Sequence, residues 1–185
     1  MKKSYRISGL VNFRDFNIHM VNTFLPFANF KKCAKVLDNK RLGKQRVEAK
    51  QIISILTDAT KTKGWRSHPA VLMWKGHAKA LMCYYNEMID EWILRGYQNN
   101  MPKYNVKGPI KLPWFIGVRS VHLSHQANLI RKDASYYLPK FPGVPEEYVK
   151  HTYIWPSKLT QEQITFLIKN KNKAADIKNF TTLRV

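Results

Sequence analysis

The sequence predicts a mainly α-helical protein, built as a single compact domain with long proline-rich connecting segments. Its 185 residues suit one domain that can bury a core of its own. In several segments apolar residues recur at spacings of three and four, which is typical of amphipathic helices. Most of the nine prolines fall between those segments, in residues 97–119 and 139–158, which we expect to be irregular.

The first elements follow from local signals. Residues 20–28 are expected to form a short extended segment. Asn29 can cap a short helix over residues 30–38, because its side-chain oxygen accepts backbone N–H groups that a helix start leaves unpaired. We expect a break at residues 39–43 and then a second helix over residues 44–57, with apolar side chains along one face.

The longest periodic segment predicts one helix from Pro69 to Arg95. Pro69 suits the first turn of a helix, and Gly96 suits its C-terminal stop. The apolar side chains that recur on one face are Val71, Trp74, Ala78, Leu81, Tyr85, Met88 and Trp92. Residues 61–64, just before this helix, are expected to form a loop.

Two further helices complete the prediction. Ser120 is placed to cap a helix that ends at Lys132. Thr160 and Gln163 have the spacing of a capping box, which predicts a last helix over residues 161–169.

The chain therefore divides into an N-terminal extension (residues 1–19), a helical domain (residues 20–170) and a basic C-terminal tail (residues 171–185). No apolar run is long enough for a transmembrane helix, and the start of the chain lacks the apolar core of a secretory signal. Cys33 and Cys83 form neither a disulfide framework nor a zinc ribbon. We expect an intracellular protein with reduced thiols, located wherever its nucleic acid is.

Charge gives the first indication of function. The chain has 32 Lys and Arg residues against 12 Asp and Glu residues, a formal net charge of +20. Aromatic residues make up 12% of it, which excludes a disordered basic tail and indicates a folded protein with a polyanionic partner. We expect nucleic acid, most consistently double-stranded DNA, and no membrane partner, because no basic helix carries a clean exposed apolar face. A basic structural protein of ribosomal type is the alternative.

One carboxylate is out of place in the most basic segment. Residues 31–50 contain eight basic residues and only two acids, Asp38 and Glu48. If the helix extends back to Arg41, then Arg41, Lys44 and Glu48 share one sector at the border of the apolar face. A carboxylate there is partly desolvated and near cations, so its pKa can be tuned. An ordinary Lys44–Glu48 pair at i,i+4 is the alternative.

Four histidines are candidate functional residues. His77, at the margin of the apolar stripe, is either a core residue or a nucleic-acid contact, and His68 before Pro69 is either a helix cap or such a contact. His122 and His125 have a spacing that can hold a metal, but no third ligand lies nearby in sequence, so we expect no metal.

Other residues are expected at a nucleic-acid surface. Arg131 and Lys132 end a predicted helix, where they can reach phosphates. Trp65, Trp114 and Trp155 lie in irregular segments and are candidates for stacking on an unstacked base. The expected nucleic-acid contacts are Lys40, Arg41, Arg46, Arg66, His68, His77, Arg119, His125, Arg131 and Lys132.

Five segments carry a family resemblance over residues 20–156. In order they read NTFLPFANFKKCAKVLDNKRLGKQRVEA, GWRSHPAVLMWKGHAKAL, DEWILRGY, SHQANLIRKDASYY and YIWP. Together they resemble the pyrimidine-dimer DNA glycosylase (endonuclease-V-like) family, in particular its little-characterised cytoplasmic branch. The resemblance implies a small, mostly helical protein that needs no metal or cofactor.

The resemblance also implies a mechanism. Characterised members kink the duplex, flip a base and cut the glycosidic bond at a pyrimidine dimer, and then break the strand through a Schiff base on an N-terminal amine. Glu48 matches the carboxylate that assists the sugar chemistry, with Arg41, Lys44 and Arg46 as neighbours that position phosphates. Val21 would supply the amine only in a chain that starts there. In a chain that starts at Met1, Lys44 is the natural substitute.

Two hypotheses follow from the sequence. The first is a DNA glycosylase, with lyase activity as a possible second step, that acts on a pyrimidine dimer or modified pyrimidine. The second is a catalytically silent protein of the same fold that coats or packages DNA or RNA.

Overall fold

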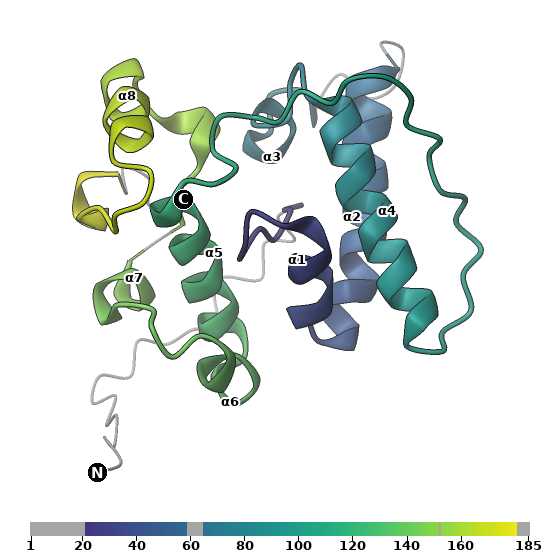
Figure 1. The fold of residues 1–185 in the computed structure, drawn as a ribbon, viewed down its shortest axis with the longest axis horizontal. Coiled ribbons are helices and arrows are strands. Elements are labelled where there is room, and N and C mark those ends of the chain that lie inside the picture. The colour runs from purple at the N-terminus through teal and green to yellow at the C-terminus, as the bar shows by residue number, and fades with distance from the viewer. Residues whose placement is uncertain (1–20, 59–64, 152, 181–185) are drawn as a thin grey trace.

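The structure, a computed structural model, describes residues 21–58, 65–151 and 153–180. All of the regular elements in these ranges are helices, which confirms the mainly α fold (Figure 1). The predicted extension and the predicted loop before Pro69 lie outside the described residues. The part of the predicted tail that is described lies against the domain, with Ile177 and Phe180 buried.

Three helices form one group. Helices α1 (Phe30–Val36) and α2 (Asn39–Thr57) both pack against α4 (Ala78–Leu94). The predicted cap of α1 is confirmed, because Asn29 Oδ1 accepts from the Lys32 N–H at 2.9 Å. Helices α2 and α4 lie side by side over most of their length (Figure 1).

Helix α2 begins earlier than the sequence predicted. Asp38 is its N-cap and accepts from the Arg41 N–H at 2.9 Å. The expected break at residues 39–43 is therefore wrong, because this cap starts the helix one residue after Asp38. As a result, Arg41, Lys44 and Glu48 lie on one continuous helix.

The long helix expected from Pro69 to Arg95 is in fact two helices. Helix α3 (Pro69–Leu72) is separated from α4 by a turn in which Gly76 has a φ of 79°. The His77 N–H donates to the Trp74 carbonyl at 2.9 Å and closes this turn. Residues with side chains rarely adopt a positive φ, so the glycine permits the break.

The second group follows the long connection after α4. It comprises α5 (Arg119–Lys132), α6 (Ala134–Tyr137), α7 (Glu146–Lys150) and α8 (Gln161–Lys169). The capping box at the start of α8 is confirmed. Three short 3-10 helices complete the described structure: η3 (Leu138–Lys140), η4 (Pro156–Lys158) and η5 (Ile177–Asn179).

Two expectations for this half are corrected. Ser120 does not cap α5, which has Val118 at its N-cap. Instead, the Ser120 hydroxyl donates to the Lys173 carbonyl at 3.1 Å and accepts from the Ala175 N–H at 2.9 Å. The segment 139–158 is not entirely irregular, because α7 and η4 form within it.

The extended segment at the start of the described chain lies between the two groups (Figure 1). Thr23 and Leu25 are fully buried. The Trp74 indole N–H donates to Thr23 Oγ1 at 2.9 Å, and the Phe24 N–H donates to Gln45 Oε1 at 2.9 Å. Because side chains satisfy its polar groups, this segment can cross the core without a strand partner. Among the described helices, none is long and apolar enough to cross a membrane.

Candidate active site

Glu48 lies in the middle of α2 and is 5% exposed. Its Oε2 accepts from the Gln45 side-chain amide at 2.7 Å, and its Oε1 lies 3.3 Å from the Lys44 ammonium nitrogen. The Lys44–Glu48 pair that was the simpler alternative therefore exists, but its carboxylate is buried, whereas the Lys44 side chain is half exposed. A buried carboxylate with an exposed partner differs from an ordinary surface pair.

Burial raises the pKa of the Glu48 carboxyl, because it disfavours the charged form. The Lys44 ammonium, the Asn22 backbone N–H and the more distant charge of Lys132 all act in the opposite direction on this pKa. Glu48 is thus a desolvated carboxyl with cations from two different helices around it.

Lys132 reaches this region from the last turn of α5. The Arg41 guanidinium and the Asp133 carboxylate lie 3.9 Å apart, which brings the start of α2 beside the end of α5. Burial, followed by the charges of Arg41, Lys44 and Arg131, lowers the pKa of the Lys132 ammonium. The structure therefore brings together four of the residues predicted from the sequence: Arg41, Lys44, Glu48 and Lys132.

Gln45 holds the carboxylate in place, and the sequence alone did not indicate this residue. Its side chain is fully buried and makes four hydrogen bonds. The amide nitrogen donates to Glu48 and to the Asn22 carbonyl at 2.9 Å. The amide oxygen accepts from the Phe24 N–H at 2.9 Å and the Tyr84 hydroxyl at 2.6 Å. A polar side chain on the apolar face of an amphipathic helix is the signal that could have found it.

These bonds place the start of the described chain at the site. Asn22 is bound to Gln45 through its carbonyl and acts on Glu48 through its N–H. Val21, the preceding residue, is half-buried. The candidate amine position and the candidate carboxylate are therefore neighbours in space, although 27 positions separate them in the sequence.

His125 belongs to the interior rather than to the surface. It is fully buried, and its Nδ1 accepts from the Leu25 N–H at 3.1 Å. Its Nε2 therefore carries the proton and donates to the Tyr153 hydroxyl at 2.8 Å, which in turn donates to Asn22 Oδ1 at 3.1 Å. Burial holds the pKa of His125 well below its usual value. In this conformation His125 supports Asn22 and cannot reach a phosphate.

Three arginines that were expected to contact phosphates bind other parts of the protein instead. The Arg46 guanidinium lies 3.9 Å from the Trp92 ring centroid and donates to Asn99 Oδ1 at 3.0 Å. Arg41 pairs with Asp38 and lies over the Tyr137 ring. The five N–H donors of an arginine make it suited to such bridging. Arg131 binds three main-chain carbonyls near the end of α7, those of Tyr148, Val149 and His151.

The remaining cations are more accessible. Lys40, Arg66 and Arg119 are exposed, although Arg66 also donates to the Asp58 carbonyl at 3.1 Å. Lys132 is exposed as a whole residue, although its ammonium group is partly desolvated. They remain candidates for phosphate contact. His68 caps α3 by accepting from the Ala70 N–H at 3.2 Å, so the capping role is observed. His77 is half-buried, and its Nδ1 lies 3.0 Å from the Lys111 carbonyl oxygen.

The three candidate stacking residues differ in exposure. Trp65 is 44% exposed, with its ring centroid 5.3 Å from that of His68. Trp114 is half-buried and meets Phe115 edge-on. Trp155 is 6% exposed and packs against Tyr153, so its ring faces are covered by protein. Of the three, Trp65 is the one with an open ring surface for a base.

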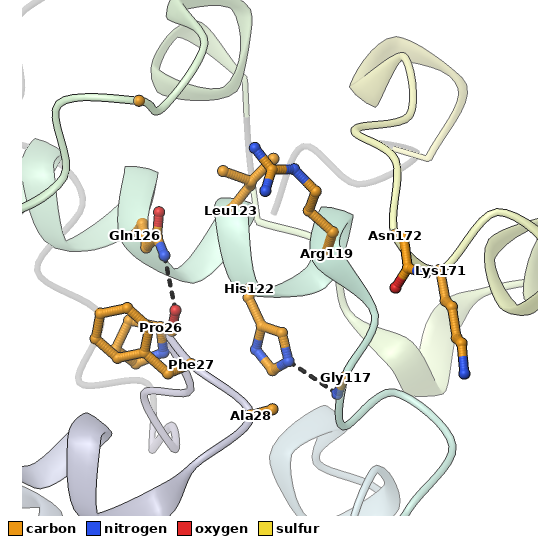
Figure 2. A pocket seen from close by; sticks show the side chains of 11 residues that line it. Pro26, Phe27, Ala28, Gly117, Arg119, His122, Leu123, Gln126, Lys171 and Asn172 are labelled. Atoms are coloured by element: carbon orange, nitrogen blue, oxygen red, sulfur yellow. Dashed lines mark hydrogen bonds between the residues drawn. The ribbon is translucent and has the colours of Figure 1, made fainter.

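The histidine pair is not arranged to hold a metal. His122 Nδ1 donates to the Leu25 carbonyl at 2.7 Å, and Nε2 accepts from the Gly117 N–H at 2.9 Å (Figure 2). His125 also uses both ring nitrogens. In the described parts of the chain, no group of three or more His, Cys, Asp or Glu residues could hold a metal ion. His122 instead lines a cavity of about 370 Å³, together with Phe27 and Arg119. Figure 2 shows how these side chains lie around it.

The fold and the site together define a class. The chain is basic, its described elements are all helices, and its buried Glu48 carboxyl is held by an amide, lies 3.3 Å from the Lys44 ammonium nitrogen and is influenced by the more distant charge of Lys132. Residues 21–105 match the family model described as pyrimidine dimer DNA glycosylase, which confirms the family resemblance over these residues. The family has a DNA glycosylase type of function, with DNA as the partner. No curated protein and no solved structure matches this chain.

Proposed function

We propose that this protein is a DNA glycosylase that removes a damaged or modified pyrimidine, such as a pyrimidine dimer, from double-stranded DNA. The supporting observation is Glu48, a carboxyl that is buried, hydrogen-bonded to Gln45, paired with Lys44 and influenced by the more distant charge of Lys132. A DNA substrate agrees with the family match and with the net charge of +20. It also implies an intracellular location.

Glu48 acts on the charge that develops in the reaction. As the glycosidic bond breaks, the sugar acquires positive charge at C1′, and a fixed carboxylate stabilises that charge in the transition state more than in the bound substrate. Gln45 holds the carboxylate, so little reorganisation is needed. Lys44 and Lys132 bind the phosphates on either side of the sugar, which offsets the repulsion between these phosphates and Glu48.

A lyase step requires an amine beside C1′. The amine would condense with the sugar aldehyde, lose water and form an imine, after which β-elimination breaks the strand. Val21 adjoins the site and would serve in a chain that starts there. In the full chain Lys44 is the substitute named from the sequence, and Lys132, whose pKa is lowered, is a second candidate in the structure.

The second candidate function is a silent DNA- or RNA-binding protein of the same fold. It is favoured by one observation: in a chain in which other residues precede Val21, the nitrogen of Val21 is an amide, which cannot form an imine.

The deciding experiment compares wild type with Glu48→Gln on a dimer-containing duplex of about 20 base pairs. Gln is nearly isosteric, so folding and DNA affinity should persist while single-turnover excision, measured as alkali-labile sites, falls by roughly 100-fold or more. Glu162→Gln, at the exposed start of α8, removes the same charge and should excise normally. Borohydride trapping of an adduct reports the lyase step separately. Wild-type excision in Glu48→Gln would remove Glu48 from the mechanism, and no excision by the wild type would favour the silent binder.

The pH profile provides a second readout. Because burial raises the pKa of Glu48, the excision rate should fall on acidification at a higher pH than an ordinary carboxylate would cause. This acid limb should be absent from the residual activity of Glu48→Gln.

A further inference from the structure

A second concave surface lies away from Glu48. It is a hollow of about 380 Å³ where α4 begins, lined by the basic residues Lys75, His77, Lys79 and Lys111, with Leu56 from the end of α2. We call it the basic hollow. None of the described residues that line it is acidic. Concave surfaces with charge of one sign concentrate counter-ions of the other sign.

The basic hollow is held together by its own contacts. The Lys79 ammonium donates to the Lys107 carbonyl at 3.1 Å, and the His77 ring meets the Lys111 carbonyl. These contacts fasten residues 107–111 to the first turn of α4. The loop contributes only main-chain carbonyl oxygens to these contacts. The side chains of Lys107 and Lys111 therefore take no part in them and are exposed.

We propose that the basic hollow binds the phosphodiester backbone of DNA outside the excision site. Lysine ammonium groups are compact charges that suit phosphate, and each phosphate neutralised releases counter-ions. The other lining residues, Leu56, Gly76, Ala78 and Pro109, carry no charge that competes with a phosphate. The N-terminus of α4, the positive end of its dipole, also adjoins the hollow.

The position of the hollow predicts which phosphates it binds. Leu56 lies eight residues after Glu48 on α2, or about 12 Å along the helix axis. One DNA strand advances about 3.4 Å per nucleotide, so for a duplex that lies parallel to α2 the hollow should bind phosphates roughly three to four nucleotides from the reacting sugar. This spacing rests on the proposed role of Glu48, whereas the binding itself does not.

The first test measures the salt dependence of binding to an undamaged duplex. The variant Lys75→Gln/Lys79→Gln/Lys111→Gln should bind more weakly, with a log K against log salt slope smaller by about 0.9 for each phosphate that the protein no longer neutralises. The control Lys31→Gln/Lys32→Gln/Lys35→Gln removes the same charge from the exposed side of α1 and should keep the wild-type slope. Lys75→Gln/Lys111→Gln retains the Lys79 bond and serves if the triple variant does not fold.

The second test locates the bound phosphates. A neutral methylphosphonate is placed at successive positions on each side of the lesion. A methylphosphonate about three to four nucleotides from the lesion should weaken DNA binding by the wild type. It should not weaken DNA binding by the triple variant further, because the methylphosphonate and the lysine substitutions remove the same interaction.

A wild-type slope in the triple variant, an equal decrease of the slope in the α1 control, or a methylphosphonate effect that is the same in both proteins would overturn the proposal. Excision by the wild type is scored separately. An inactive protein whose triple variant still shows the smaller slope would refute the glycosylase and leave the basic hollow as a DNA-binding surface.

Discussion

Gln45 is the residue that connects the candidate site to the core. The hydrogen bonds of its buried amide join α2, the extended segment and α4. Buried amides with all partners present fix one geometry, and a partly satisfied network is costly. Gln45 is therefore a positioning residue, whose contribution to function acts through Glu48 and Asn22.

We expect Gln45→Leu to be strongly destabilising. Leucine fits the volume but leaves the Asn22 carbonyl, the Phe24 N–H and the Tyr84 hydroxyl without this partner, at about 2–5 kcal/mol in total. Urea unfolding measures the decrease in stability. Gln51→Leu, on the exposed side of the same helix, is the control and should change the midpoint little. Equal midpoints for the two variants would contradict the positioning role.

The sequence indicated some site residues and not others for a physical reason. Glu48 was found because a buried-face carboxylate in the most basic segment of the chain is anomalous, and this anomaly is visible in the sequence. The roles of Arg46 and His125 were not visible, because they depend on Asn99 and Leu25, which are 53 and 100 positions away. Exposure of a basic side chain is a property of tertiary structure, which local spacing does not encode.

At the scale of elements, local capping signals were the most reliable guide. The capping box of Thr160 and Gln163 fixed the start of α8, because both partners lie within one turn. The break between α3 and α4 was missed, because the apolar spacing continues across it and a single glycine inside a helical pattern is usually tolerated. The basic hollow depends on this break, since His77 and Lys79 line it where α4 restarts.

We expect Gly76→Ala to destabilise the protein by about 1–2 kcal/mol. No atom lies within 4 Å of the added Cβ, so the cost comes from the positive φ alone. Gly143→Ala is the matched control, because its Cβ also meets nothing within 4 Å and its φ is not positive. Thermal unfolding should show a drop of a few degrees for the first variant and little for the second. Equal melting temperatures would show that the turn tolerates alanine.

At the scale of the whole molecule, the 3.6-residue periodicity of the sequence predicts the mainly α class. It does not predict how the helices pack together. Side chains of α2, α4 and α5 bind the segment Asn22–Leu25. No local sequence pattern predicts a buried extended segment that has no strand partner. The histidines that bind this segment must be neutral for it to stay buried, so the stability of the fold should depend on pH.

Stability should fall as the pH drops below about 6.5. Burial lowers the pKa of both His122 and His125 in the folded protein, so the unfolded chain takes up protons in this range before the folded chain does. Their contribution is complete above the unfolded pKa and decreases by up to about 1.4 kcal/mol per pH unit for each histidine. Urea midpoints between about pH 7.5 and 5 measure the effect. Imidazole signals of both residues titrating near pH 6.5 in the folded protein would contradict it.

The hydrogen bond between Tyr153 and Asn22 spans 131 positions, and it has a consequence for biosynthesis. A ribosome that has released residues 21–105, the part that matches the family, has already made Glu48, Gln45 and Tyr84. It has not yet made α5 or Tyr153. Contacts so distant along the chain form late, because the intervening loop must first close. The nascent protein therefore carries Glu48, Gln45 and Asn22 well before Tyr153 can bind the Asn22 side chain.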